Sequence, residues 1–256
     1  MAPPPLASRE AVREERFSDV WSNELNDAFA DIARYYDRAN EIAALGLWST
    51  FLRRFMNTVD IKPQQKVLDV CAGTNAIGIA LLKREPTLDV HAMDRSAEMQ
   101  TVGQQNAAAL GFQIKSTIGD VHVLPFPDHH FDIVTLQFAS RHLRVREVFT
   151  EILRVLKPGG HFYHSDLLRP RNPIVKNLYY AYLRSCLGLT GLIVGSGPAA
   201  VKAKQYFLDA LELFYTAEDL SILLRELGYV QVRMDTVFHG MLGFHRAVKP
   251  LPAIQA

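Results

Sequence analysis

The chain has few cysteines, no long uninterrupted apolar run and almost no excess of charge of either sign. Its 256 residues include two cysteines, Cys71 and Cys186, and carry a formal net charge of +1 at pH 7. Two such cysteines form neither a disulfide framework nor a zinc-ligand pattern, so we expect no metal site and a reducing, cytoplasmic environment. The balanced charge gives no reason to expect a nucleic-acid partner.

Glycine-rich phosphate-binding loops are also missing. Residues 66–75 read KVLDVCAGTN, which has neither the Gly-x-Gly-x-x-Gly pattern nor the Gly-Lys-Ser/Thr ending of a phosphate loop. An apolar run instead ends in an acid and turns through small residues into a helical segment. Residues 90–94 then repeat the apolar run and the acid. This arrangement predicts a nucleoside-binding βαβ unit without a pyrophosphate cradle.

Two carboxylates indicate the ligand of this unit. Asp69 lies inside the turn, where its charge suits the amino group or sulfonium of S-adenosylmethionine better than phosphates. Asp94, at the end of the second apolar run, is placed to accept hydrogen bonds from a ribose diol. Gly73 lies between them and lets a ligand approach the main chain closely. A buried structural role explains either acid alone, but the pair at this spacing favours a cofactor site.

Other residues at the same strand ends are candidate cofactor contacts. Gly119 and Asp120 end the third expected strand, where a carboxylate can reach the adenine amino group; a surface loop acid is the alternative interpretation of Asp120. The remaining candidates adjoin the other strand ends and are Cys71, Thr74, Arg95 and Gln137.

Helical and strand patterns alternate along the chain. We predict a disordered tail over residues 1–13 and a helical segment over residues 14–60, where apolar residues recur at three- and four-residue steps. Strand patterns follow at residues 66–70, 89–93, 113–118, 131–137 and 161–165, with helical patterns between them at 76–84, 97–110 and 145–156. This alternation predicts a parallel sheet with right-handed crossovers.

The last third of the chain has a different pattern. Residues 172–197 are apolar but interrupted by Arg184 and several glycines, which argues against a membrane span. This segment fits either a buried cap over the sheet or a surface for a lipid tail or an anionic membrane. Residues 229–238 and 241–248 alternate like the two strands of an antiparallel hairpin. The whole pattern predicts an α/β fold with the seven-stranded, mostly parallel, Rossmann-like sheet of the class I methyltransferases.

Candidate catalytic residues follow the fourth expected strand. Residues 138–143 read FASRHL and reach the carboxyl edge of the sheet, where open α/β folds bind their ligands. Arg141 and His142 are the candidates, and an imidazole with its usual pKa of about 6.5 suits proton transfer near neutrality. A residue that merely begins a helix is the alternative interpretation of His142. His164 and Asp166 form a weaker candidate pair after the fifth strand.

With these motifs in view, the sequence resembles the ubiquinone and menaquinone biosynthesis C-methyltransferases. The similar segments are FxxIAxxYDxxN at residues 29–40, DVCAGT at 69–74, Asn-Pro before a tyrosine-rich helix at 172–182, and GxxxxHxxxK at 240–249. Some positions depart from the family pattern. Asn75 replaces a glycine of the cofactor loop, His142 replaces an asparagine after the arginine, and residues 47–51 lack the usual His-Arg-x-x-Trp pattern.

The resemblance implies a methyltransferase domain over residues 61–256 with a helical cap inserted at about 170–214. It also implies S-adenosylmethionine as cofactor and a polyprenylated benzoquinol or naphthoquinol as acceptor. Arg141 would then stabilise the acceptor phenolate or position a water that takes its proton.

Tyrosines are candidates for the lining of an acceptor site, because each combines apolar area with a hydroxyl that can orient a quinol oxygen. The candidates are Tyr36, Tyr179, Tyr180 and Tyr182. Core packing explains any one of them equally well.

Two other functions stay open at this point. The acceptor could be a soluble phenolic natural product, or the chain could be a binding or scaffold protein that retains the fold without catalysis. Asn75 and His142 allow the scaffold interpretation, whereas Arg141 and the intact pair of acids favour the enzyme. Peripheral contact with the inner face of a membrane and a homodimer also stay open.

Overall fold

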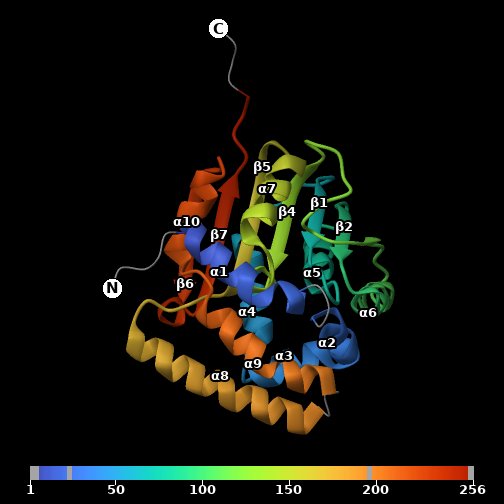
Figure 1. Ribbon diagram of the computed structural model, residues 1–256. Coiled ribbons are helices and arrows are strands. Elements are labelled where there is room, and N and C mark those ends of the chain that lie inside the picture. Colours follow the sequence, from blue (N-terminus) through green and yellow to red (C-terminus); the bar gives the residue numbers. More distant parts are fainter. Residues whose placement is uncertain (1–5, 22–24, 195–197, 253–256) are drawn as a thin grey trace.

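A computed structural model describes residues 6–21, 25–194 and 198–252. It contains one seven-stranded sheet with helices on both faces (Figure 1). The strands are β1 (Lys66–Val70), β2 (Asp89–Asp94), β3 (Lys115–Ile118), β4 (Phe131–Gln137), β5 (Leu156–Leu167), β6 (Val230–Val237) and β7 (Leu242–Val248).

Helices precede, separate and cap these strands. The α-helices are α1 (Leu6–Asp19), α2 (Leu25–Ile32), α3 (Tyr36–Ala43), α4 (Trp48–Thr58), α5 (Ala76–Arg84), α6 (Ala97–Ala108), α7 (Val145–Val155), α8 (Pro173–Val194), α9 (Pro198–Glu212) and α10 (Ala217–Glu226). Short 3₁₀ helices are η2 (Ala33–Tyr35), η3 (Ser140–His142) and η4 (Phe238–Gly240).

The strand order is β3-β2-β1-β4-β5-β7-β6, so the chain starts in the middle of the sheet and crosses over between β3 and β4. All paired neighbours from β3 to β5 are parallel, whereas β7 runs antiparallel to both β5 and β6. The predicted seven-stranded, mostly parallel sheet with a C-terminal hairpin is therefore confirmed. In such sheets ligands bind at the carboxyl ends of the strands on either side of the crossover, here β1 and β4.

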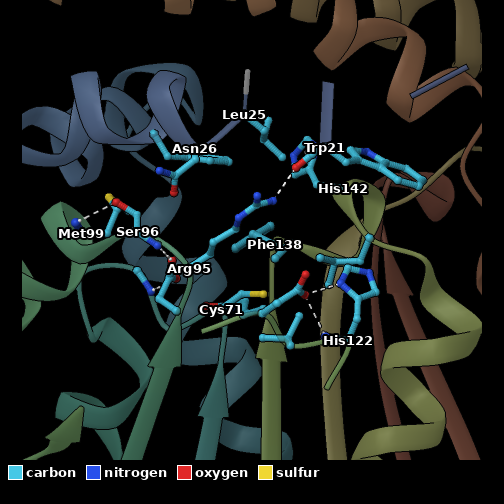
Figure 2. Close-up of a pocket in the computed structure, with 18 of the residues that line it drawn as sticks. Trp21, Leu25, Asn26, Cys71, Arg95, Ser96, Met99, His122, Phe138 and His142 are labelled. Atoms are coloured by element: carbon cyan, nitrogen blue, oxygen red, sulfur yellow. Dashed lines mark hydrogen bonds and ion pairs between the residues drawn. The ribbon is translucent and has the colours of Figure 1, made fainter. Parts of the chain in front are cut away.

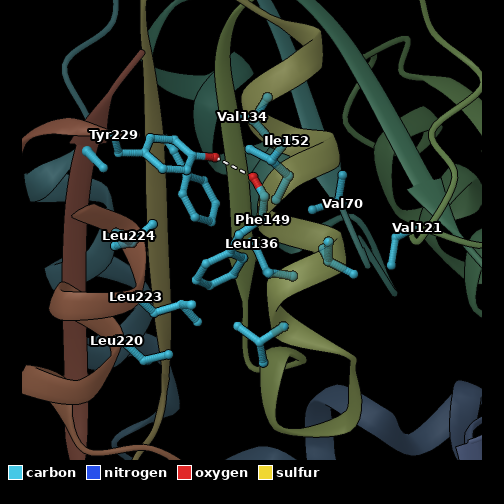
Figure 3. Close-up of a cluster of buried hydrophobic side chains, with 14 of the residues drawn as sticks. Val70, Val121, Val134, Leu136, Phe149, Ile152, Leu220, Leu223, Leu224 and Tyr229 are labelled. Atoms are coloured by element: carbon cyan, nitrogen blue, oxygen red, sulfur yellow. Dashed lines mark hydrogen bonds between the residues drawn. The ribbon is translucent and has the colours of Figure 1, made fainter. Parts of the chain in front are cut away.

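The core lies on both faces of the sheet because side chains alternate along each strand. Val134 and Leu136 pack in the cluster that includes α7 and α10, whereas Ile133 packs in the cluster that includes α4 and α5. In the first cluster, the Tyr229 hydroxyl donates to the Phe149 carbonyl at 2.8 Å (Figure 3). Burial of each such side chain contributes about 1.5 to 3 kcal/mol, so the sheet is a rigid base for its carboxyl-end loops.

Hydrogen bonds fix the residues at which α10 and β5 begin. A capping box begins α10: the Thr216 hydroxyl accepts from the Asp219 N–H, and the Asp219 carboxylate accepts from the Thr216 N–H. The fifth strand is longer than predicted and begins at Leu156. Residues 157–160 belong to the sheet because Gly159 N–H donates to the Lys249 carbonyl and Lys249 N–H donates to the Gly160 carbonyl, both at 2.9 Å.

The prediction of a disordered N-terminal tail is wrong for residues 6–13, which form the first part of α1. Residues 1–5 lie outside the described residues. Long-range contacts hold this polar helix in place. The buried Arg13 donates from Nη2 to the carbonyls of Arg141 and Leu143, at 3.0 and 3.1 Å, and Arg9 pairs with Asp219 at 2.5 Å. Sequence composition could not show these partners.

Helices α2, α3, α8 and α9 gather at the end of the sheet toward which the parallel strands point (Figure 1). Helices α8 and α9 occupy the region expected for the cap. Among the described helices, none is long and apolar enough to cross a membrane. The N-terminal helices and the cap thus cover the sheet edge where the fold binds its ligands.

Candidate functional site

Three cavities adjoin one another at the carboxyl edge of the sheet. The strand-end cavity, of about 120 Å³, lies above β1, β2 and β4 and beneath the N-terminal helices (Figure 2). Its lining includes Trp21, Phe29, Cys71, Gly73, Asp94, Arg95, Met99, Asp120, Gln137 and His142. The turn cavity is smaller and follows the β1 turn, and the tyrosine cavity, of about 310 Å³, lies between α3, α4 and α8.

Asp94 ties the β1 turn to the end of β2. Its Oδ2 accepts from the Gly73 N–H at 2.8 Å and its Oδ1 from the Ser96 N–H at 2.9 Å. Burial raises the pKa of this carboxyl, although the backbone donors counteract part of the effect. Gly73 has a φ of +52°, a left-handed conformation that suits glycine. The predicted cofactor turn is thus built around the two residues that the sequence singled out.

Asp69 has an unusual environment beneath this turn. Its Oδ1 accepts from the Thr135 hydroxyl at 2.6 Å, but its Oδ2 is buried without any hydrogen-bond partner. Burial raises the pKa of the carboxyl to about 7, against the effect of the Thr135 hydrogen bond. Asp69 lines the turn cavity rather than the strand-end cavity. A buried carboxylate oxygen without a donor matches the ammonium group of S-adenosylmethionine in charge and hydrogen-bonding capacity.

Asn75 preserves the shape of the turn. It adopts a left-handed conformation with a φ of +61°, which asparagine tolerates better than most residues. Its side-chain oxygen accepts from Gln100 Nε2 at 3.0 Å, and a Cβ on Gly103 would stand 2.8 Å from Asn75 Cγ. The side chain therefore packs against α6 and lines none of the three cavities. The departure from glycine does not obstruct the site.

The other predicted cofactor contacts divide into three groups. Those that line the strand-end cavity are Cys71, Arg95, Asp120 and Gln137. Thr74 lines only the turn cavity, where its hydroxyl donates to Asp37 Oδ1 at 2.9 Å and joins the turn to α3. Gly119 lines none of the three; a Cβ there would stand 2.9 Å from Met93 Cε. The small size of Gly119 therefore serves packing beneath the site.

The tyrosine cavity brings together Arg141 and three predicted acceptor residues, Tyr36, Tyr179 and Tyr182, but not Tyr180. The hydroxyl of Tyr179 is buried without a hydrogen-bond partner, and burial raises its pKa above the usual value. Most of the remaining lining is apolar and includes Leu45, Leu47, Trp48, Phe51, Leu183 and Phe238. A few polar groups in an apolar wall are typical of a small-molecule site.

Tyr36 and Phe138 line all three cavities and so form the wall between them. Phe138 has a φ of +58°, which is strained for a bulky residue by about 1 to 3 kcal/mol. Its N–H donates to the Ser165 carbonyl and its carbonyl accepts from Arg141 Nη1, both at 2.8 Å. These contacts offset the strain and hold the ring at the boundary.

Arg141 and His142 are adjacent in sequence but belong to different cavities. Arg141 is paired with the buried Asp166 carboxylate. Burial disfavours the guanidinium charge, but Asp166 together with the neighbouring tyrosines counteracts burial, and the pKa of Arg141 is raised. His142 lines the strand-end cavity, with Nδ1 2.7 Å from the Tyr206 hydroxyl. That hydroxyl also accepts from Trp21 Nε1 at 2.8 Å, which joins His142 to the N-terminal segment.

The environment of His142 disfavours the protonated form of its ring. Burial lowers its pKa well below the usual value, and its Nε2 is enclosed without a partner. His142 also lies outside the tyrosine cavity that Arg141 lines. The packing of η3 therefore separates the two side chains.

Sequence reasoning missed several lining residues. Trp21, Leu25 and Asn26 reach the strand-end cavity from the N-terminal segment, and Asn40 and Trp48 reach the tyrosine cavity. The regular apolar spacing of this segment predicted helices, but it gave no sign of which sheet edge they would cover. Phe29 belonged to a quoted family motif and could have been selected on that ground.

The crossover sheet, the acid near the end of β1 with the turn that follows it, and the second acid at the end of β2 define a class I S-adenosylmethionine-dependent methyltransferase. The sequence placed Asp69 inside the turn, whereas it is the last residue but one of β1. The chain belongs to the ubiE/COQ5 methyltransferase family, whose sequence model matches residues 17–249. The resemblance noted in the sequence is thereby confirmed, as are the enzyme class and the cofactor.

Individual relatives agree with this assignment. Demethylmenaquinone methyltransferase of Paenarthrobacter aurescens is 31% identical over 229 residues, which cover 89% of this chain and 87% of that one. Ubiquinone/menaquinone biosynthesis C-methyltransferase UbiE of Ectopseudomonas mendocina is 27% identical, with 88% of each chain covered. A solved S-adenosylmethionine-dependent methyltransferase from Aquifex aeolicus is similar in fold, with a TM-score of 0.56 at 18% identity, covering 82% of this chain and 98% of that one.

Proposed function

We propose that the chain transfers a methyl group from S-adenosylmethionine to a ring carbon of a benzoquinol or naphthoquinol that carries an apolar tail. The observation that carries this proposal is the tyrosine cavity, which adjoins the other two through Tyr36 and Phe138 and combines Arg141 with an apolar wall. The names of the relatives, which include ubiquinone and menaquinone biosynthesis, support the same acceptor class.

The cofactor supplies an electrophilic methyl group on its sulfonium. Asp94 would accept from the ribose hydroxyls, and the partnerless Oδ2 of Asp69 would accept from the amino group. Asp120, at the far side of the strand-end cavity, would accept from the adenine amino group. Burial of Asp69 and Asp94 strengthens these contacts because the local dielectric is low.

Arg141 would act on the acceptor. Loss of the phenolic proton makes the ring carbon beside the oxygen nucleophilic, and a guanidinium at that oxygen stabilises the resulting anion. Tyr179 offers a buried hydroxyl without another partner to the same oxygen or its neighbour. Phe138 and Tyr36 would keep water away from the boundary at which carbon and methyl meet. The loss of one such electrostatic contact typically costs a factor of about 10² to 10³ in rate.

The outer part of the tyrosine cavity suits an apolar tail. Leu45, Leu47 and Phe238 line the cavity while remaining 70%, 40% and 49% exposed. Ile174 and Leu178 on α8 are also exposed. A tail leaving the ring would pass over this apolar rim, and the same rim would face the membrane that holds such an acceptor. Sedimentation with anionic liposomes at low and high salt would measure this contact.

Methyl transfer to defined acceptors tests the proposal. The full chain is incubated with ¹³C-methyl S-adenosylmethionine and, separately, a demethylated naphthoquinol, a demethylated benzoquinol and a tailless phenol. Mass spectrometry should place the label on a ring carbon of a tailed quinol. Labelling of the tailless phenol alone would favour the soluble-product alternative. Cofactor binding without transfer to any of the three would favour the scaffold alternative.

A further inference from the structure

His122 lies in the wall of the strand-end cavity, two residues after Asp120. Only 10% of its side chain is exposed. Both ring nitrogens have partners: Nδ1 contacts Asp120 Oδ1 (Figure 2), and Nε2 lies 3.1 Å from the backbone nitrogen of Arg144. A histidine held at both nitrogens can fix the orientation of the carboxylate beside it.

The contact with Arg144 determines the tautomer of the His122 ring. A backbone N–H only donates, so Nε2 accepts and carries no proton. The neutral ring therefore carries its proton on Nδ1 and donates it to Asp120 Oδ1. The peptide that supplies this N–H is itself held, because the Leu143 carbonyl accepts from Arg13 Nη2 at 3.1 Å. His122 is thus anchored to a fixed peptide and acts as a donor toward Asp120.

Both donors of His122 go to the same carboxylate oxygen. The backbone N–H donates to Asp120 Oδ1 at 2.9 Å, and the ring Nδ1 donates to Oδ1 as well, so neither bond occupies Oδ2. Burial would raise the pKa of Asp120, but the two bonds from His122 and the charge of Arg95 lower it below the usual value. Asp120 is therefore ionised, and its second oxygen is left to accept from a ligand in the cavity.

We propose that His122 is a positioning residue that presents Asp120 Oδ2 as an acceptor and so selects a cofactor with a 6-amino group on its base over an analogue with a 6-oxo group. A carboxylate has no proton to give such an oxygen, so two acceptors would oppose each other. Because 54% of its side chain is exposed, Asp120 would turn toward solvent without the bonds from His122. The inference rests on the proposed function only in placing the adenine at Asp120.

Binding of two product analogues measures this selection without any acceptor. S-Adenosylhomocysteine carries the 6-amino group, whereas S-inosylhomocysteine carries a 6-oxo group at the same ring carbon. In calorimetry with the full chain, S-adenosylhomocysteine should bind about 10- to 100-fold more tightly, the range for leaving one polar group without a partner. The two bases also differ at N1, so the informative quantity is the change in this affinity ratio between variants.

Two substitutions of His122 separate the roles of its ring nitrogens. In His122→Asn the amide nitrogen takes the place of Nδ1 and can still donate to Asp120, whereas in His122→Gln the amide oxygen takes the place of Nε2 and can still accept from Arg144. His122→Asn should keep the parent ratio within about threefold, and His122→Gln should lower the ratio to about threefold or less. An equal loss in both variants would show that the ring only packs the loop, and would overturn the inference.

A substitution of Asp120 gives a second test, because His122 also decides which way an amide at this position points. In Asp120→Asn the two donors of His122 would hold the amide oxygen, so the amide nitrogen would face the cavity and donate to a 6-oxo group. Asp120→Asn should therefore reverse the preference, so that S-inosylhomocysteine binds more tightly than S-adenosylhomocysteine. Combining Asp120→Asn with His122→Gln should weaken this reversed preference, because the amide is then free to turn over.

His161→Gln is the matched control. His161 on β5 contacts Arg246 at 2.9 Å and lines none of the three cavities, so its variant should keep the parent ratio. Thermal unfolding at the parent temperature would show that each variant is folded. The inference is overturned if the parent binds both ligands equally, if His122→Gln keeps the parent ratio, or if Asp120→Asn prefers S-adenosylhomocysteine as strongly as the parent does.

The test is independent of the acceptor. The expected set of affinity ratios together with no quinol methylation would refute the proposed function and leave the role of His122 intact. Quinol methylation by a protein whose ratios do not change in the variants would refute the role of His122 alone.

Discussion

Asp69→Asn should make the ligand-free protein more stable while removing most of its affinity for S-adenosylmethionine. The Asp69 side chain is buried, with one carboxylate oxygen lacking a partner and a pKa of about 7. Ionisation is therefore costly in the folded state and nearly free in the unfolded chain. An amide of the same shape can still accept from Thr135 and never ionises.

The size and pH dependence of this stability difference follow from the different pKa of Asp69 in the folded and unfolded chains. The folded pKa of about 7 exceeds the ordinary value of 3.8, so the contribution of Asp69 to stability is fully present below about pH 4 and is lost as the pH rises toward 7. At 1.36 kcal/mol per unit, the loss approaches about 4 kcal/mol above pH 7. Asp69→Asn avoids this loss. The free energy of unfolding of the variant should equal that of the parent near pH 4 and exceed it by about 2 to 4 kcal/mol at pH 8.

Urea unfolding of the ligand-free proteins at pH 4, 6 and 8 measures the stability difference, and calorimetry at pH 8 measures cofactor affinity. Asp132→Asn is a suitable control, because Asp132 pairs with Lys157 at 2.7 Å at the other end of β4; it should lower stability slightly and leave cofactor affinity unchanged. If Asp69→Asn is less stable than the parent at pH 8, or binds the cofactor normally, the reasoning about the partnerless oxygen is wrong.

Other predictions concern the acceptor, the ribose contact and the tail. Arg141→Ala should lower turnover by about two to four orders of magnitude with little change in cofactor affinity, and Arg141→Lys should recover only part of the rate. The control Arg144→Ala, three residues away in an exposed pair with Glu147, should retain normal turnover and cofactor affinity. Near-normal turnover of Arg141→Ala in a methyl-transfer assay would contradict the mechanism. Asp94→Ala should weaken cofactor binding by about 1 to 3 kcal/mol in calorimetry, and unchanged affinity would remove Asp94 from the site. Long-tailed quinols should give a higher kcat/KM than short-tailed ones, at about 0.8 kcal/mol per buried methylene. Phe238→Ser should reduce this difference in kcat/KM. Equal kcat/KM across tail lengths in the parent would exclude the apolar rim as the tail site.

The sequence by itself determined the sheet and the place of the site. Apolar runs with the period of strands, separated by helical patterns, are local signals, and the parallel order follows from the crossovers that such patterns require. Asp69, Gly73 and Asp94 were selected for the same reason: they lie at or just beyond the carboxyl ends of β1 and β2, and the carboxyl ends of parallel strands meet at one edge. Arg141 was identified as a candidate by its position after the fourth strand.

Tertiary packing decided which of these side chains share a cavity. Arg141 and His142 are neighbours in the chain, yet the turn of η3 sends them to different cavities. The left-handed Phe138, the docking of α1 through Arg13, and the buried contacts that link Asp166, Ser140, His164 and His245 all depend on partners 24 to 130 residues away. Such contacts leave no local pattern, because they arise only when separate elements fold against one another and bury their polar groups together.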